Sequence, residues 1–139
     1  MEGYVSNDFA SLDLFDQIEI EANNEMTINY TGEFKPKKGF YDDCIIKRTL
    51  NFLNFDKNLK LKINIIKNIP VQGGLGSAST NAAAIIKFFE DMNLIKIKPP
   101  EFYAPLGADI PSFLFRKDCF VSGIGDNIFY HIFPKYFFY

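Results

Sequence analysis

The chain has 139 residues, which is enough for one domain built around a single hydrophobic core. Its 47% hydrophobic and 23% charged residues are typical of a globular protein and exclude a long disordered or low-complexity chain. The formal net charge of −2 provides no broad positive field, so nucleic acid is not an expected partner.

Targeting and redox signals are weak. No basic segment followed by an apolar stretch opens the chain, and no run of about 18 apolar residues occurs, so we expect a cytoplasmic protein without a membrane partner. Cys44 and Cys119 lack metal-ligand spacing, and buried free thiols are the simpler interpretation. The aromatic-rich end at 128–139 predicts a domain that is cut there, with an exposed sheet edge through which the chain self-associates.

The N-terminal third predicts two strands and a helix. Apolar and polar residues alternate at 12–21 and again at 26–30, and the turn-like Asn23-Asn24 between them favours an antiparallel hairpin. A loop rich in Gly, Pro and Lys follows at 32–39. From Asp42-Asp43, which can cap a helix, we expect a helix that ends near Phe55.

The middle of the chain predicts a strand, a glycine cluster and a long helix. The strand at 61–65 runs into Pro70 and the glycines. The helix that follows has an apolar face and a polar face. The apolar face comprises Ala82, Ile85, Ile86, Phe89 and Met92, and the polar face Asn81, Lys87, Glu90 and Asp91. After Pro99-Pro100, apolar runs at 110–115 and 120–124 predict a short helix or strand and then a strand.

The glycine cluster carries the strongest chemical signal. It reads Ile69-Pro-Val-Gln-Gly-Gly-Leu-Gly-Ser-Ala-Ser-Thr-Asn-Ala-Ala83 and lies between the predicted strand and helix. Glycines allow close backbone approach to a ligand, and a helix N-terminus attracts phosphate. The predicted ATP phosphate-binding residues are Gly73, Gly74, Leu75, Gly76, Ser77, Ala78, Ser79 and Thr80. A glycine-rich turn without a ligand is the alternative.

This segment is neither a Walker A loop nor a dinucleotide fingerprint, because the Gly-Lys-Ser/Thr ending and the GxGxxG spacing are both absent. It resembles the glycine signature of the GHMP kinases, which transfer phosphate from ATP to small alcohols. The resemblance implies ATP, with Mg²⁺ bound alongside it, and a small-molecule substrate.

A second motif narrows the resemblance. Pro105-Leu-Gly-Ala-Asp-Ile-Pro-Ser-Phe-Leu114 is similar to a segment of the 4-diphosphocytidyl-2-C-methyl-D-erythritol kinases, a family of isoprenoid biosynthesis. By this resemblance Asp109 is the catalytic carboxylate, which accepts the proton of the substrate's 2-hydroxyl. An isolated Asp after Gly-Ala is otherwise a turn residue or a helix cap. Weaker matches at 12–20, 43–50 and 120–126 follow the family's order.

The chain also departs from the family. Family sequences carry a lysine near the catalytic aspartate and an Asp-Gly-Tyr-His segment that holds the cytosine. Here no lysine can be assigned that role, and Glu2-Gly-Tyr-Val5 retains only Tyr4 as a substrate-binding residue. These differences leave open a catalytically inactive remnant that at most binds nucleotide. Another GHMP kinase with a different alcohol substrate and an unrelated structural domain are weaker alternatives.

The resemblance implies an α+β fold of the ribosomal protein S5 domain 2-like type, a mostly antiparallel sheet with two or three helices. Residues 1–139 would form one GHMP kinase N-terminal domain, truncated at both ends, and the truncation is expected to impair activity. His131 is the only histidine, and its apolar sequence neighbours favour ordinary packing over catalysis.

Overall fold

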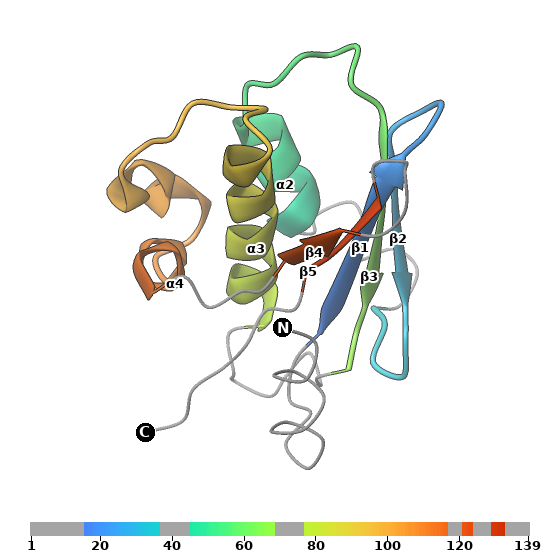
Figure 1. The fold of residues 1–139 in the computed structure, drawn as a ribbon. Helices are drawn as coiled ribbons and strands as arrows, with labels where there is room; N and C mark the ends of the chain where they lie inside the picture. Colours follow the sequence, from blue (N-terminus) through green and yellow to red (C-terminus); the bar gives the residue numbers. More distant parts are fainter. Residues whose placement is uncertain (1–15, 37–44, 69–76, 117–120, 124–128, 133–139) are drawn as a thin grey trace.

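One mixed sheet and the helices packed on it make up the structure, a computed structural model that describes residues 16–36, 45–68, 77–116, 121–123 and 129–132 (Figure 1). The elements in chain order are β1 (Gln17–Ala22), β2 (Thr27–Thr31), α2 (Ile45–Phe52), β3 (Leu61–Ile66), α3 (Ser77–Asp91), the 3-10 helix η1 (Pro100–Leu106), α4 (Ile110–Arg116), β4 (Val121–Gly123) and β5 (Phe129–Ile132). The described strands form one sheet in the order β2-β3-β1-β5-β4. The fold is therefore α+β.

The alternation in the sequence separates the two faces of the sheet. Ile18, Ile20, Ile63 and Ile65 are fully buried, whereas Glu19 and the other intervening side chains of β1 are only half-buried. Burial of each isoleucine stabilises the fold by about 1.5–3 kcal/mol. One face of the sheet thus forms one side of the hydrophobic core, and the helices lie over that face in Figure 1.

The predicted hairpin is wrong. β1 and β2 are not neighbours, because β3 lies between them, antiparallel to β1 and parallel to β2. The link of four residues, 23–26, passes over the first residues of β3, where Ala22 pairs with Leu61 and Thr27 with Lys62. It is long enough, since four extended residues reach about 13 Å and two strand spacings are roughly 9.6 Å. The other two strand pairs, β1 with β5 and β4 with β5, are antiparallel. The expected mostly antiparallel sheet is confirmed.

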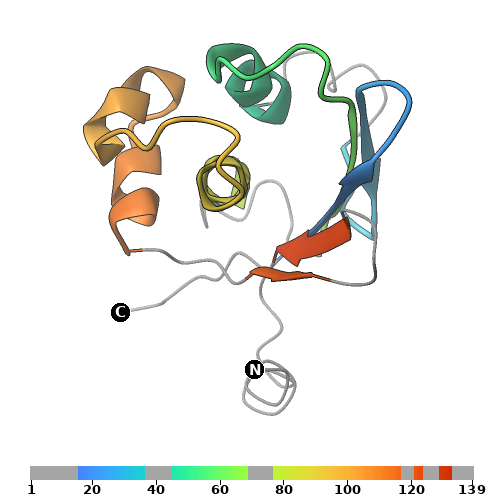
Figure 2. The same ribbon diagram turned by 45° about the horizontal axis from the view of Figure 1, so that its top comes forward.

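The long helix α3 occupies the centre of the helical layer. In Figure 2 it lies between the sheet and the pair η1 and α4, with α2 beside it. Its buried side chains include Ala82, Ile85, Ile86, Phe88 and Phe89. The helix ends in a Schellman motif, in which Asn93 has φ 60°, the Asn93 N–H donates to Glu90 O and the Leu94 N–H donates to Phe89 O.

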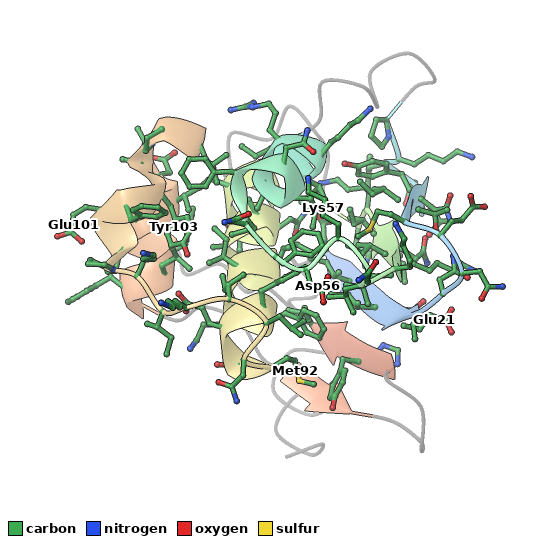
Figure 3. The ribbon with its side chains drawn as sticks, turned by 90° about the horizontal axis from the view of Figure 1, so that it is seen from above. Glu21, Asp56, Lys57, Met92, Glu101 and Tyr103 are labelled. Carbon is green, nitrogen blue, oxygen red and sulfur yellow. The ribbon has the colours of Figure 1, made fainter. Side chains whose placement is uncertain are left out.

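The predicted strand at 61–65 and the long helix after the glycines are confirmed, and the run at 110–115 is a helix. The helix expected from Asp42-Asp43 to about Phe55 is present as α2 but ends at Phe52, and its predicted start lies outside the described residues. Between Pro99 and Leu106 the chain forms η1, which sequence patterns did not indicate. Pro99 is extended and Pro100 occupies the first turn, where a missing N–H costs nothing. Figure 3 shows Glu101 and Tyr103 on η1. Glu101 is exposed, whereas Tyr103 is buried against Phe52 of α2.

Two features are absent from the described residues. None of the helices in that part of the chain is long and apolar enough to span a membrane. Within the same residues no three His, Cys, Asp or Glu side chains are grouped so that they could hold a metal ion.

Candidate active site

The first candidate feature is the start of α3. Gly73, Gly74, Leu75 and Gly76 lie outside the described residues, and Ser77, Ala78, Ser79 and Thr80 form the first turn of α3. The first four N–H groups of a helix have no partner inside the helix, and the helix dipole makes this end electropositive. The first turn contains no acidic residue, so no carboxylate of that turn would repel a phosphate group.

The side chains of this turn differ in access. Ala78 is exposed and Ser79 is half-buried, but Thr80 is 1% exposed and belongs to the interior. The prediction that hydroxyl groups of this turn face a phosphate therefore fits the position of Ser79 and does not fit that of Thr80.

Asp109, the predicted base, immediately precedes α4. Its backbone oxygen accepts hydrogen bonds from the Phe113 N–H at 3.4 Å and from Ser112 Oγ at 2.9 Å, which makes it the residue at which the helix begins. The residue is exposed. Asp109 is thus a helix-terminal residue, as the simpler interpretation held, and its carboxylate is also accessible to a substrate.

The structure brings the two motifs together. A Cβ added to Gly107 would lie 3.7 Å from Ser79 Oγ and 3.3 Å from Cδ1 of Ile110. The backbone two residues before Asp109 therefore lies directly against the first turn of α3. An added Cβ would be tight only against Ile110, because 3.7 Å from Ser79 Oγ is an ordinary van der Waals distance.

Two hydrogen bonds also hold the backbone at Leu106 and Gly107. Arg48 of α2 donates from Nη2 to the backbone oxygen of Leu106 at 2.8 Å, and the Ile110 N–H donates to Gly107 O at 3.1 Å. A charged donor makes a stronger hydrogen bond than a neutral one. These two bonds fix the turn that presents Asp109.

Sequence analysis missed a buried polar cluster beside this site. Asp16 is 0% exposed, Lys67 is 5% exposed and Asn81 is 2% exposed. Lys67 Nζ lies 2.6 Å and Asn81 Nδ2 2.9 Å from Asp16 Oδ2. The prediction that Asn81 faces outward is wrong, because Asn81 stands one turn before the buried Ile85.

The register of each element contained the signal for this cluster. Asp16 shares the parity of Ile18 and Ile20, and Lys67 shares that of Ile63 and Ile65. In a strand, residues of one parity face one side of the sheet. Both charged residues were therefore predictable as core-facing.

His131 lies on the opposite, polar face of the sheet. Its Nδ1 is 3.2 Å from Gln17 Nε2 and 3.6 Å from Glu19 Oε2. Its apolar sequence neighbours alternate in side-chain direction along β5, so its partners are polar, and the expectation of an ordinary packing role in place of a catalytic one stays a prediction. His131 therefore lies on the face of the sheet opposite the helices, away from Asp109 and the start of α3.

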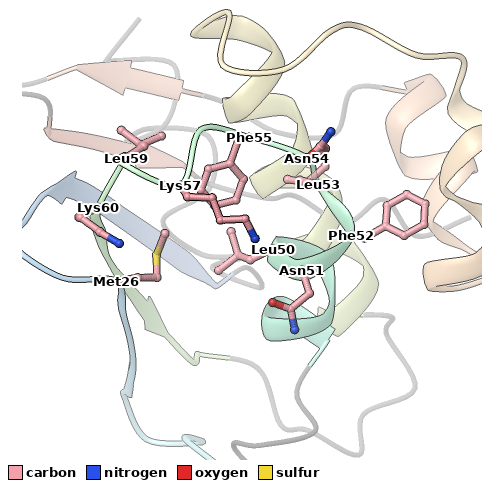
Figure 4. A pocket seen from close by; sticks show the side chains of 10 residues that line it. All are labelled: Met26, Leu50, Asn51, Phe52, Leu53, Asn54, Phe55, Lys57, Leu59 and Lys60. Atoms are coloured by element: carbon pink, nitrogen blue, oxygen red, sulfur yellow. The ribbon is translucent and has the colours of Figure 1, made fainter.

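An open pocket lies elsewhere. Figure 4 shows this cavity of about 460 Å³ beside the C-terminal end of α2. Its lining comprises Met26, Leu50, Asn51, Phe52, Leu53, Asn54, Phe55, Lys57, Leu59 and Lys60. None of these residues belongs to either motif, so the pocket is not part of the candidate site. Tyr4, Cys44 and Cys119 lie outside the described residues.

Comparison with known proteins decides the family. The sequence profile of the GHMP kinases N terminal domain matches residues 44–117, which is more than half of the chain and includes both motifs. The chain belongs to this family. The GHMP N-terminal domain described above thus pairs a helix start with an aspartate-bearing turn, inside a match that runs from α2 to the end of α4.

Curated relatives carry a narrower name. The chain is 32% identical over 134 residues to 4-diphosphocytidyl-2-C-methyl-D-erythritol kinase of Francisella tularensis subsp. tularensis. The aligned region covers 92% of this chain and 48% of that protein. The chain is 34% identical over 93 residues to the kinase of the same name from Leptospira biflexa, covering 65% of this chain and 30% of that protein. This GHMP domain spans about half the length, or less, of the curated relatives it matches.

Proposed function

We propose that this chain forms the ATP-binding and catalytic part of a 4-diphosphocytidyl-2-C-methyl-D-erythritol kinase. The reaction is transfer of the γ-phosphoryl group of ATP to the 2-hydroxyl of the erythritol moiety. The observation that carries the proposal is the proximity of Gly107 to Ser79, which brings the aspartate motif next to the helix start that we propose binds phosphate. The names of the relatives support the substrate.

The nucleotide would bind at residues Gly73 to Thr80. The unpaired N–H groups at the start of α3 would donate to phosphate oxygens, and the absence of acidic residues from the first turn favours that anion. Mg²⁺ bound with ATP would neutralise part of the negative charge of the phosphates. Since the described residues contain no acidic cluster for a metal, phosphate oxygens and water would be its main ligands, as is usual for Mg²⁺.

Asp109 would act as the base. Its carboxylate accepts the proton of the 2-hydroxyl while that oxygen bonds to the γ-phosphorus and the bond from phosphorus to the leaving ADP oxygen breaks. The exposed position of Asp109 at the start of α4 supports this role, because the carboxylate can meet a substrate that arrives from solvent. Arg48, Gly107 and Ile110 would keep the carboxylate in place through the turn.

The remaining assignments belong to the same proposal. Tyr4 would contact the cytosine of the substrate, residues 1–139 would form one domain of a cytoplasmic protein, and the chain would self-associate. The strand order β2-β3-β1-β5-β4 with helices on one face supports an S5-like assignment. Neither nucleic acid nor a membrane is a proposed partner.

The proposal is tested by ADP release in the presence of MgATP and the diphosphocytidyl substrate, with the named Francisella kinase as the positive control. We expect substrate-dependent release that is slower than that of the control kinase, as truncation implies, and that falls by about 10²-fold or more in Asp109→Asn. The control Asp91→Asn removes the same charge from an exposed pair with Lys87 and should leave the rate unchanged. Equal rates for wild type and Asp109→Asn contradict the role of Asp109, and nucleotide binding without any turnover favours the inactive remnant.

A further inference from the structure

The buried carboxylate of Asp16 is used by nothing in the proposed reaction, yet it makes three strong contacts. Oδ2 accepts from Lys67 Nζ at 2.6 Å and from Asn81 Nδ2 at 2.9 Å, and Oδ1 accepts from the backbone N–H of Asn68 at 2.7 Å. An ionised carboxylate with several good donors can be held in an interior that would otherwise exclude it.

Asp16 and its partners come from three separate parts of the fold. Asp16 immediately precedes β1, Lys67 and Asn68 immediately follow β3, and Asn81 lies in the second turn of α3. Lys67 and Asn68 are the last described residues before α3 begins. One side chain therefore ties the end of β3 to the beginning of the helix proposed to bind phosphate.

The contact also fixes the orientation of Asn81. An ionised carboxylate can only accept hydrogen bonds, so the amide must turn its Nδ2 toward Asp16. Its Oδ1 is buried and has no hydrogen-bond partner in the structure as described. An amide that leaves its oxygen unsatisfied indicates that the bond to Asp16 dominates its placement.

We propose that Asp16 is a positioning residue for nucleotide binding, which acts by holding the first turns of α3 in register with the end of β3. Displacement of this helix start by about 1 Å would misplace the phosphate donors and cost affinity and rate. The inference rests on the proposed function for its consequence in nucleotide binding. The coupling between the helix start and Asp16 is a property of the fold and is measured separately.

The first test compares Asp16→Asn with Glu21→Gln. Both changes remove one negative charge at or near β1, but Glu21 makes only an exposed ion pair at 3.9 Å with Lys62. The dissociation constant of MgADP is measured by calorimetry on the intact chain, well below the unfolding temperature. We expect an increase of about tenfold for Asp16→Asn and no change for Glu21→Gln.

Asp16→Asn leaves the Lys67 ammonium buried and unneutralised, so it can prevent folding. Asn81→Ala avoids this problem, because it keeps the pair of Asp16 and Lys67 and places a good helix former in α3. Its matched control is Asn64→Ala. Asn64 also donates one hydrogen bond to a carboxylate, Glu19 Oε1 at 3.3 Å, and also has a buried unpaired Oδ1, but it lies in the middle of β3.

The readout for this pair is the MgADP dissociation constant together with hydrogen exchange at the amides of Ala82 to Ala84, which close the first turns of α3. Weaker binding and faster exchange in Asn81→Ala, compared with Asn64→Ala, support the proposal. Binding and exchange equal to those of Asn64→Ala in a folded Asn81→Ala protein overturn it. If the wild-type chain binds no nucleotide, the proposed function fails, and the exchange comparison alone decides whether Asp16 positions the helix.

Discussion

Two glycines, Gly32 and Gly107, lie in segments that hold the site, and alanine substitution should affect them very differently. Gly32 has φ 96°, and an added Cβ would lie 2.6 Å from the backbone O and 2.8 Å from the backbone N of Lys67. Gly107 has φ 175°, which any residue adopts, and its added Cβ would first meet the flexible Ile110 side chain at 3.3 Å.

The magnitudes follow from these contacts. Alanine at a positive φ costs about 1–2 kcal/mol, and contacts below 3.0 Å with backbone atoms require the end of β3 to move. The lower entropy of the unfolded chain offsets about 0.4–1 kcal/mol of this cost. We expect Gly32→Ala to lower the free energy of unfolding by about 2–4 kcal/mol, and Gly107→Ala by less than about 1 kcal/mol.

Urea unfolding followed by circular dichroism measures both variants, since the chain has no tryptophan to report by fluorescence. Gly32→Ala should also weaken the contact of Lys67 with Asp16, because the clash is with the Lys67 backbone. Equal costs for the two substitutions, or a larger cost at Gly107, refute the account of how these segments pack.

Three further predictions concern other elements. Asn93→Ala should cost about 1 kcal/mol of stability through its positive φ, whereas Asn93→Gly should not; equal unfolding midpoints for the two contradict this. Burial, with the nearby Glu90 carboxylate, raises the pKa of Tyr103 to about 12, against about 10 when unfolded, so its stabilisation is complete below pH 10 and is lost as pH rises toward 12. Urea unfolding at pH 8 and pH 11 should reveal a loss on the order of 1 kcal/mol that is absent in Tyr103→Phe, and equal losses in both proteins count against it. Arg48→Met removes the bond to Leu106 O and should lower the free energy of unfolding by about 1 kcal/mol, with faster exchange at the Ile110 amide; unchanged exchange there shows that Arg48 does not hold the turn.

Strong periodicity explains which elements were predictable. β3 and α3 have a clear period of two and of about 3.6 residues, respectively, and both lie where the patterns indicated. The hairpin of β1 and β2 failed for a physical reason. Four linking residues fit either direct neighbours or strands separated by one other, and pairing partners are decided by contacts distant in sequence.

The candidate site was predictable as two motifs and unpredictable as an arrangement. Gly107 and Ser79 are 28 residues apart, and no local pattern shows that they touch. The cluster of Asp16, Lys67 and Asn81 was hidden for a different reason. Asn81 was assigned to the solvent side, and Asp16 and Lys67 were assigned to neither face, although all three positions match the buried phase of their elements. Only their mutual pairing makes such burial favourable.

The central claim is that the start of α3 binds the phosphates of ATP, and hydrogen exchange with and without MgATP tests it most directly. The amides of Ser77 to Ser79 lie in the first turn, where an α-helix supplies no acceptor for the N–H groups, so a bound phosphate should slow their exchange. The amides of Ile45 to Arg48, at the start of α2, are the internal control and should not change. Protection at α2 or elsewhere, with none at Ser77 to Ser79, contradicts the claim.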